Sequence, residues 1–513
     1  MKRFLSIFIC IAIIFSLSAC SLSGGNAVFS VGVADTVSSF NPILAQTDAE
    51  RMLSANCFEG LVRFDEQGNI TLAGATAYTT EKDGLSYTFK LNPEAEWHMD
   101  AQTKEAVKAL DSDTFDTHIT AQDYAFGFEK FKEASDKLDS VKEIKAIDDY
   151  TLEINLGRED YDLLYKLAAL PLYPCSKAFY EAMGDKYGSS PETILFNGPY
   201  YVEQYSQNEI IISRSRYYNG NIQIKAKQIH IYTGSDKKTL PDQFIDGTYN
   251  LYISDSIGSN PEKAEAVSFS YDTVWGIAFN CKSKLGSSKT FRQVLLSSVV
   301  QPYEINLPAF ALSRADAIFP PTYSVGGRVF SAYANEEILY KEDTEAAVKT
   351  LAALQARYKI EAYTVSFAAP YDMKAVAEKI IDDWKGLFGD SVNVTLTLYN
   401  KEEAQTIAEQ AEYDLAILPI ITGSNTASAL FNTIADAPCY YSDSNLWSLG
   451  KDISTISNTN FTIYANAQKH LIENSVFIPL FYTGKALYIS DEYKGVYLAD
   501  GGKLIYFHAG EEV

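Results

Sequence analysis

Residues 56–91 read NCFEGLVRFDEQGNITLAGATAYTTEKDGLSYTFKL, and this stretch predicts two β-hairpins in series. The first hairpin has a short apolar strand that ends at Phe64, a turn at 66–69 and a second strand that begins at Ile70. The second follows the Asp-Gly pair at 83–84, which signals a turn because glycine adopts positive φ without steric cost. Apolar and polar residues then alternate up to Leu91, as in a strand with one buried face.

Helical and strand patterns occur together in the rest of the chain. A helix is expected from Thr120, with Thr120 as its N-cap and Asp123 three residues on. Met373, Val376, Ile380, Trp384 and Leu387 lie on one helical stripe, which is followed by an alternating strand at 392–398. Residues 413–419 are nearly continuously apolar, as in a strand covered on both faces. The pattern predicts a mixed α/β protein.

The opening stretch also carries a resemblance to a known family. Phe58 to Leu61, Asp65, Gly68, Asp83-Gly84, Tyr87 to Phe89 and Trp97 stand in the order and spacing of the N-terminal signature of family 5 extracellular solute-binding proteins. These proteins are the oligopeptide and dipeptide receptors of ABC importers. Later strings at 120–123, 197–202 and 476–482 are also similar to the family, so the resemblance runs from about residue 28 to about residue 510.

The resemblance implies a two-lobed, mixed α/β fold of the type II periplasmic-binding-protein kind, with an extra α+β domain inserted in the first lobe. The expected divisions are a signal peptide at 1–19, a lipidated flexible leader at 20–27, lobe I at 28–62 with 192–270 and 486–513, the inserted domain at 63–191, and lobe II at 271–485.

The first residues predict secretion and lipid attachment. Lys2 and Arg3 precede an uncharged run of sixteen residues, Phe4 to Ala19, whose last three residues form Leu-Ser-Ala-Cys with Cys20. That run is short for a membrane span, and the basic head is typical of a signal peptide. Leu-Ser-Ala-Cys resembles a lipobox, which implies cleavage before Cys20 and a lipid on its thiol. A plain signal peptide with an incidental cysteine, or an uncleaved anchor, is the alternative.

Composition and charge limit the partners. The chain has 513 residues, 47% of them hydrophobic, enough for large cores and unlike a disordered chain. Its formal net charge is −23, and removal of residues 1–19 takes away two basic residues and no acidic one. This balance opposes nucleic-acid binding, which depends on basic side chains against phosphates. We therefore expect no nucleic-acid partner and contact with the membrane through the lipid alone.

The cysteines and histidines form no recognisable metal or catalytic motif. There is no C-x-x-C, no H-E-x-x-H and no G-x-S-x-G. We therefore predict that the protein is not an enzyme and uses no cofactor or metal. Cys281 and Cys439 fall in the same predicted lobe and are one candidate disulfide, while buried thiols that act as small apolar groups are the other reading.

Solute binding is the function that the resemblance implies. Two lobes joined by crossing strands close over a ligand, and an extended peptide pairs its main chain with strand edges. In the peptide-binding members of the family, an aspartate after the strand at 413–419 neutralises the ligand's amine. Here Gly423 stands at that place. Either an acidic residue from another segment replaces it, or the solute is neutral, anionic or blocked at its amine.

The predicted solute-lining residues are polar or aromatic and lie in loops or near the expected crossing strands. They are Ser38, Ser39, Tyr252, Trp275, Thr422, Gly423, Ser424 and Asn425. For each of them, an ordinary turn or a buried aromatic contact is the alternative reading.

Three functions compete on this basis. The first is a monomeric, lipid-anchored receptor on the outer face of the cell membrane, which delivers a peptide-like or other small solute to an ABC permease. The second is a surface sensor or assembly partner on the same scaffold with a degenerate pocket, which the glycine at position 423 suggests. The third, an extracellular hydrolase, needs an acid–base pair that the sequence does not reveal.

Overall fold

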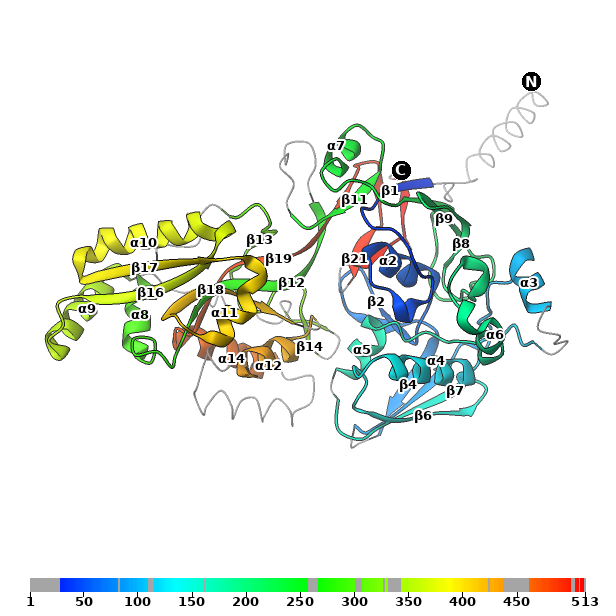
Figure 1. The fold of residues 1–513 in the computed structure, drawn as a ribbon. Coiled ribbons are helices and arrows are strands. Elements are labelled where there is room, and N and C mark those ends of the chain that lie inside the picture. The colour runs from blue at the N-terminus through cyan, green and yellow to red at the C-terminus, as the bar shows by residue number, and fades with distance from the viewer. Residues whose placement is uncertain are drawn as a thin grey trace, which may run out of the picture.

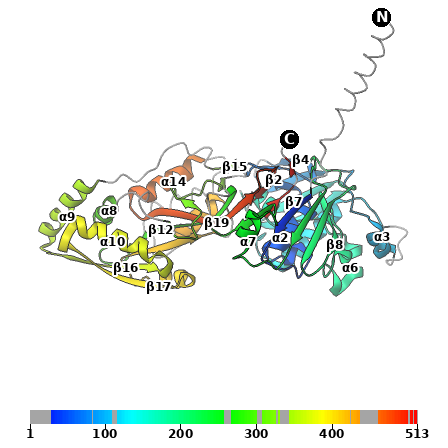
Figure 2. The ribbon, with the colours of Figure 1, turned by 90° about the horizontal axis from the view of Figure 1, so that it is seen from above.

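The computed structural model shows two bodies side by side, joined by long strands (Figure 1). It describes residues 28–81, 84–108, 115–160, 162–256, 266–299, 307–325, 328–330, 343–422, 425–436, 461–499, 503–506 and 508–511. Seen from above, β12 and β19 run from one body into the other (Figure 2). The mixed α/β fold expected from the sequence is confirmed.

The two bodies share one sheet of eleven strands. Its order is β17-β16-β18-β12-β19-β11-β1-β10-β9-β8, with β13 paired to β19 off this path. The crossing strands are β12 (Ala266–Phe279) and β19 (Phe477–Ile489). Both are longer than the sequence pattern indicated, because each pairs first within one lobe and then continues into the other. The predicted lobe boundaries at 270 and 485 therefore fall inside the crossing strands.

The first lobe contains the N-terminal strand and the C-terminal segment. Its elements are β1 (Val28–Gly32), α2 (Asp48–Cys57), β8 (Tyr200–Tyr205), β9 (Glu209–Arg214), β10 (Gln228–Tyr232), α7 (Leu240–Ile245), β11 (Leu251–Ser254), β20 (Tyr493–Lys494), β21 (Tyr497–Ala499), β22 (Lys503–Ile505) and β23 (Gly510–Glu511). α2 begins with a capping box, in which Thr47 and Glu50 each satisfy a backbone N–H of the first turn.

The two hairpins expected from residues 56–91 are confirmed. β2 (Val62–Phe64) pairs with β3 (Ile70–Leu72), and β4 (Ala75–Thr80) pairs with β5 (Ser86–Leu91). The second hairpin joins β6 (Val141–Asp148) and β7 (Thr151–Leu156) in a four-stranded sheet of order β4-β5-β7-β6. α4 (Ala121–Ala134) packs on β6 and β7, and α3 (Ala101–Lys108), α5 (Leu163–Ala169) and α6 (Lys177–Met183) complete this inserted domain.

The second lobe is a parallel unit added to the crossing strands. Its strands are β13 (Ser313–Arg314), β14 (Ser324–Val325), β15 (Arg328–Val329), β16 (Tyr363–Pro370), β17 (Val392–Tyr399) and β18 (Leu415–Ile421), and its helices are α8 (Lys289–Ser297), α9 (Thr344–Tyr358), α10 (Lys374–Phe388), α11 (Ala404–Gln410), α12 (Ala427–Asp436) and α14 (Phe461–Glu473). The predicted stripe on α10 is buried at Val376, Ile380 and Trp384, and Trp384 Nε1 donates to the carbonyl of Leu295 on α8 over 3.0 Å.

Candidate functional site

The parallel strands of the second lobe end toward the first lobe. β18 is antiparallel to β12, with Leu415 opposite Phe279 and Ile421 opposite Thr273. Since β12 starts beside the first lobe, the end of β18 at Ile421 is the end nearer to that lobe. β16 is parallel to both β17 and β18, so all three strands have their carboxyl ends at this edge.

The parallel strands of the first lobe end toward the second. β11 is antiparallel to β19, with Leu251 opposite Ile489 and Ser254 opposite Ala486. β19 comes from the second lobe, so Ser254 is the end of β11 nearer to that lobe. β1 is parallel to β10 and β11 and ends in the same direction. The two carboxyl edges therefore face each other, and open α/β sheets bind ligands at such edges.

We name this region the interlobe face. Its residues directly follow the parallel strands, begin α2 or lie on the crossing strands where the lobes meet; they are Val33 to Asp35, Asp48, Asp255, Asp272, Tyr371, Lys401, Ile421, Thr422 and Lys485.

A small cavity opens on the first-lobe side of the interlobe face. Its volume is about 170 Å³, and it lies at the ends of β1 and β11. Backbone and apolar groups come from Gly32, Leu240 and Tyr252, and charged groups come from Asp35, Asp48, Asp255, Lys237 and Lys485. The cavity thus combines an apolar wall with several charges of both signs.

Lys485 lies at the centre of these charges. Its Nζ is 2.8 Å from Oδ2 of Asp48 and also pairs with Asp255, which Lys237 approaches to 3.2 Å. Burial lowers the pKa of Lys485, but the two carboxylates outweigh burial and raise it above its usual value. Burial raises the pKa of Asp48 and Asp255, and their bonds to Lys485 bring both below the usual range. All three groups are therefore charged at neutral pH.

The second-lobe side of the interlobe face carries exposed apolar side chains. Tyr371 follows β16 and is 58% exposed, and Ile421 ends β18 and is 63% exposed. Lys401 follows β17, and its Nζ lies 4.6 Å from the ring centre of Phe310, which packs edge-on against Trp275. These exposed apolar side chains and the cation lie at the carboxyl edge that faces the first lobe.

The predicted loop residues Ser38 and Ser39 hold a carboxylate of their own lobe. Oε1 of Glu50 accepts from the backbone N–H groups of both residues, at 2.9 and 3.2 Å, and from the Ser38 hydroxyl at 2.7 Å. Oε2 accepts from the N–H groups of Gln46 and Thr47. These bonds give the loop a structural role, and a contact of Ser38 or Ser39 with the solute stays a prediction.

The predicted aromatic residues are both buried. Tyr252 is 3% exposed, lines the 170 Å³ cavity and stacks on Tyr488 with ring centres 4.8 Å apart. Trp275 is 5% exposed and stacks on Phe481 within the second lobe. Tyr252 thus lies at the edge of the interlobe face, whereas Trp275 lies beneath it behind Phe310. Contact of either with the solute stays a prediction.

The predicted loop after β18 meets both lobes. Oγ1 of Thr422 lies 2.8 Å from the hydroxyl of Tyr323, which donates to the carbonyl of Asp272 on β12. The N–H of Asn425 donates to the hydroxyl of Tyr165 on α5 of the first body, over 2.7 Å. Gly423 and Ser424 lie outside the described residues, as do Cys20 and Cys439, so the lipid site and the Cys281–Cys439 pair stay predictions.

Sequence reasoning missed most of the charged residues of the interlobe face. Asp255 directly follows β11 and Lys401 is the second residue after β17, and the rule that ligands bind at carboxyl ends could have singled them out once strand direction was known. Lys485 had no local signal, because its partner Asp48 is 437 residues away in the chain.

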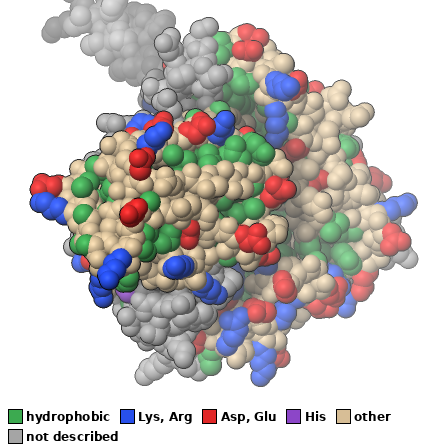
Figure 3. Space-filling view, turned by 60° about the vertical axis from the view of Figure 1, so that its left-hand side comes forward, with side chains coloured by type: hydrophobic (Ala, Val, Ile, Leu, Met, Phe, Trp, Pro, Cys, Tyr) green, Lys and Arg blue, Asp and Glu red, His purple; other side chains and the backbone are tan. Residues whose placement is uncertain are grey.

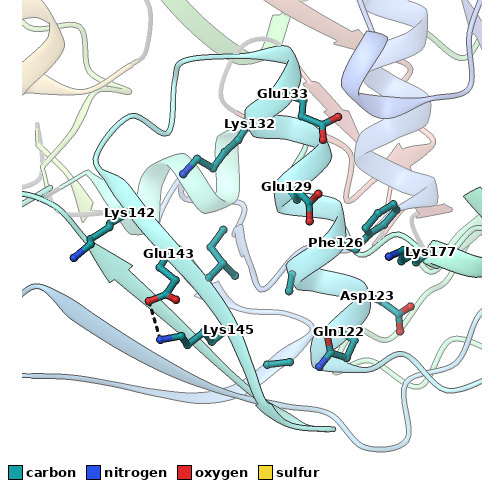
Figure 4. A pocket seen from close by; sticks show the side chains of 13 residues that line it. Gln122, Asp123, Phe126, Glu129, Lys132, Glu133, Lys142, Glu143, Lys145 and Lys177 are labelled. Atoms are coloured by element: carbon teal, nitrogen blue, oxygen red, sulfur yellow. Dashed lines mark ion pairs between the residues drawn. The ribbon is translucent and has the colours of Figure 1, made fainter.

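The largest of the described cavities lies elsewhere, between α4 and β6 of the inserted domain. Its volume is about 730 Å³. Figure 4 shows its acidic and basic side chains facing one another across the groove, with Glu129 and Glu133 on the helix and the Glu143–Lys145 ion pair on the strand. Five consecutive residues, 142–146, line it, so it follows the edge of β6, the last strand of its sheet.

The described residues show no metal cluster and no membrane-spanning helix. No group of three or more His, Cys, Asp or Glu side chains that could hold an ion occurs among them. None of the helices placed by the structure is long and apolar enough to cross a membrane. On the face of the molecule in Figure 3, basic side chains are interspersed with acidic ones.

Comparison with solved structures agrees with the two-lobed fold. HbpA2 from Haemophilus parasuis matches with a TM-score of 0.77 at 16% identity, over 95% of this chain and all of that one. The unliganded open form of the periplasmic murein tripeptide-binding protein MppA matches with a TM-score of 0.75, also at 16% identity, over 92% of this chain and 96% of that one.

Sequence relatives and a family model complete the comparison. The oligopeptide-binding protein SarA of Streptococcus gordonii is 27% identical over 44% of this chain and 36% of its own length. A dipeptide-binding protein of Lactococcus lactis is 25% identical over 56% of this chain and 57% of its own length. The matches thus span about a third to just over half of these relatives. The model for bacterial extracellular solute-binding proteins, family 5, matches residues 69–441, and the chain belongs to this family.

Proposed function

We propose that this protein is the lipid-anchored, extracytoplasmic receptor of an ABC importer, and that it captures a peptide-like or other small solute between its lobes. It then delivers the solute to a membrane permease as a monomer, without a cofactor and without catalysis. The facing carboxyl edges of the two parallel strand sets carry this proposal, since a solute between them touches both lobes at once. Relatives named as oligopeptide-binding and dipeptide-binding support the solute class.

The chemistry of the two edges suits a zwitterionic, partly apolar solute. Asp272 is an exposed carboxylate on the crossing strand β12, and it supplies a counter-charge for an ammonium group in place of the missing aspartate at 423. Tyr371 and Ile421 offer apolar surface across the cleft. Main-chain groups at the ends of β1 and β18 suit the backbone of an extended peptide.

Calorimetric titration of the purified mature protein tests the solute class. Peptides of two to six residues, the same peptides acetylated at the amine, and a set of mono- and disaccharides are compared. Binding of free peptides that is lost on acetylation supports an ammonium site at the carboxylates. Saturable binding of a sugar, with none of any peptide, would contradict the peptide assignment and leave solute capture standing.

Replacing Tyr371 with alanine is expected to weaken binding of the captured peptide about tenfold or more, because a large aromatic contact at the centre of an interface is lost. Tyr358 is a matched control. It is 57% exposed, like Tyr371, but it ends α9 and therefore precedes β16 at the amino edge of the same strand. Equal loss of affinity in Tyr371→Ala and Tyr358→Ala would show that the solute does not touch the interlobe face.

The groove along β6 favours a second candidate function, that of a surface sensor or assembly partner. An edge strand with a groove beside it accepts a further strand from another protein. Under this alternative, the purified protein binds no small solute. Replacing Lys145 with proline, which disrupts strand β6, would then weaken assembly with the partner and leave solute titrations flat.

A further inference from the structure

Two hydrogen bonds join the lobes away from the crossing strands. The hydroxyl of Tyr165, on α5 of the first body, accepts from the N–H of Asn425 over 2.7 Å. The hydroxyl of Ser428, the second residue of α12, donates to Oδ2 of Asp162, which precedes α5. The partners are separated by more than 250 residues in the chain. Figure 1 shows α5 and α12 on opposite sides of the boundary between the two bodies.

The same contact places a carboxylate at a helix start. Asp162 faces the first turn of α12, where Oγ1 of Thr426 accepts from the N–H of Ala429. A negative charge is favourable there because the N-terminal N–H groups carry partial positive charge. Burial raises the pKa of Asp162 and outweighs its bond to Ser428, which lowers it. Asp162 of the first body thus accepts a hydrogen bond from a side chain in the first turn of the second lobe's helix.

Asn425 is held from both lobes. Its N–H donates to the hydroxyl of Tyr165 in the first body. Its carbonyl accepts from the N–H of Ser324 on β14 of the second lobe, over 3.0 Å. Asn425 is 6% exposed and Tyr165 is 2% exposed, so water does not readily replace either partner. Rotation of one lobe against the other must break the bond to Tyr165, or carry the backbone at Asn425 along with it.

We infer that Asp162, Tyr165, Asn425 and Ser428 form an interlobe latch, which couples the backbone after β18 to the angle between the lobes. The latch holds one angle in the absence of solute. Its link to solute capture rests on the proposed function, because Thr422 at the end of β18 lies on the interlobe face. A solute that moves this backbone changes the latch, and a broken latch changes the solute's affinity through the same equilibrium.

The latch is tested first without any solute, by amide hydrogen exchange at Asn425 in the full-length mature protein. Tyr165→Phe removes the acceptor of that N–H and is expected to speed its exchange about tenfold. Ser428→Ala touches neither Asn425 nor Tyr165. If the four residues act as one unit, Ser428→Ala also speeds exchange at Asn425, by about fivefold or more.

Thr433→Ala is the matched control for the serine variant. Its hydroxyl also lies on α12, but it donates to the carbonyl of Ala429 within the helix. This variant is expected to leave exchange at Asn425 unchanged. Small-angle scattering of the same samples is expected to shift for Tyr165→Phe and Ser428→Ala and to stay unchanged for Thr433→Ala.

The latch would be overturned if Ser428→Ala left the exchange rate of the Asn425 amide unchanged and gave the same scattering profile as the unmodified protein. This result is independent of the solute titrations. If the latch variants respond and no solute is found, the coupling stands and solute capture fails. If a peptide binds the unmodified protein and Tyr165→Phe with the same affinity, coupling of the latch to the solute is excluded. The latch itself then depends on the exchange result alone.

Discussion

Replacing Glu50 with glutamine is expected to lower the free energy of unfolding by about 2 kcal/mol at pH 7. Glu50 is 2% exposed and accepts five hydrogen bonds, from backbone N–H groups at Ser38, Ser39, Gln46 and Thr47 and from the Ser38 hydroxyl. Burial alone would raise the pKa of Glu50, but these donors outweigh it and lower the value to about 2. A glutamine amide turns two of its own donors toward other donors and satisfies fewer of them.

The pH dependence of this loss of stability distinguishes an ionic contribution of Glu50 from a steric one. A carboxyl group whose folded pKa is depressed stabilises the protein above its unfolded pKa, and this contribution is lost as the pH falls through the folded pKa. The usual pKa of a glutamate is 4.5 and the folded pKa of Glu50 is about 2. The difference in free energy of unfolding between the unmodified protein and Glu50→Gln is therefore full at pH 7 and shrinks between about pH 5 and pH 2.

Denaturant unfolding of the Glu50→Gln variant at pH 7 and pH 4 measures the effect. Glu402→Gln is the control, since Glu402 is exposed and its replacement is expected to change the free energy of unfolding by less than about 0.5 kcal/mol. A destabilisation of the same size at both pH values would show that the lost interaction is steric rather than ionic. A change below about 0.5 kcal/mol at pH 7 would contradict the hydrogen-bond network.

Local patterns predicted the elements but not their long-range partners. The hairpins before Leu91, the N-cap at Thr120 and the buried stripe of α10 follow from turn chemistry and periodicity, which act over a few residues. Arg292 is a residue whose partners the local sequence pattern does not predict. Only the structure shows its buried guanidinium donating to the carbonyls of Gly286, Asn474 and Ser475.

The candidate site was predicted in outline, and its charges were not. The loop after β18 was placed beside the ligand by resemblance, and its described residues do meet the other lobe at Tyr165. Glu50, in contrast, carries no local sequence signal for its role, although it organises the loop at Ser38 and Ser39. The role of a carboxylate can be inferred only when its hydrogen-bond donors are known. The donors to Glu50 are backbone N–H groups in turns, and the sequence pattern does not determine the shape of these turns.

The crossing strands contain a glycine that no other residue can replace without strain. Gly484 of β19 lies where the pairing with β12 slips, between Tyr271 and Thr273, so that Asp272 has no opposite residue. Its φ is +152°, and a Cβ built there would lie 2.0 Å from the carbonyl oxygen of Ser270. The oxygen belongs to the backbone of β12 and the Cβ is fixed to the backbone of β19, so neither can move aside without breaking the ladder between the paired strands.

Gly484→Ala is therefore expected to destabilise the protein by about 3 kcal/mol or more, through steric overlap and an unfavourable φ. Gly386→Ala is the matched control. Gly386 lies in α10, no atom comes within 4 Å of its built Cβ, and the change is expected to stabilise the helix by about 1 kcal/mol. Denaturation midpoints that move in opposite directions in the two variants support this account.

Because Gly484 neighbours Lys485, a Gly484→Ala protein that still folds is also expected to lose solute binding, since the register of the crossing strands sets where Lys485 meets Asp48. A folded variant with unchanged stability would mean that the two strands are not held in this register.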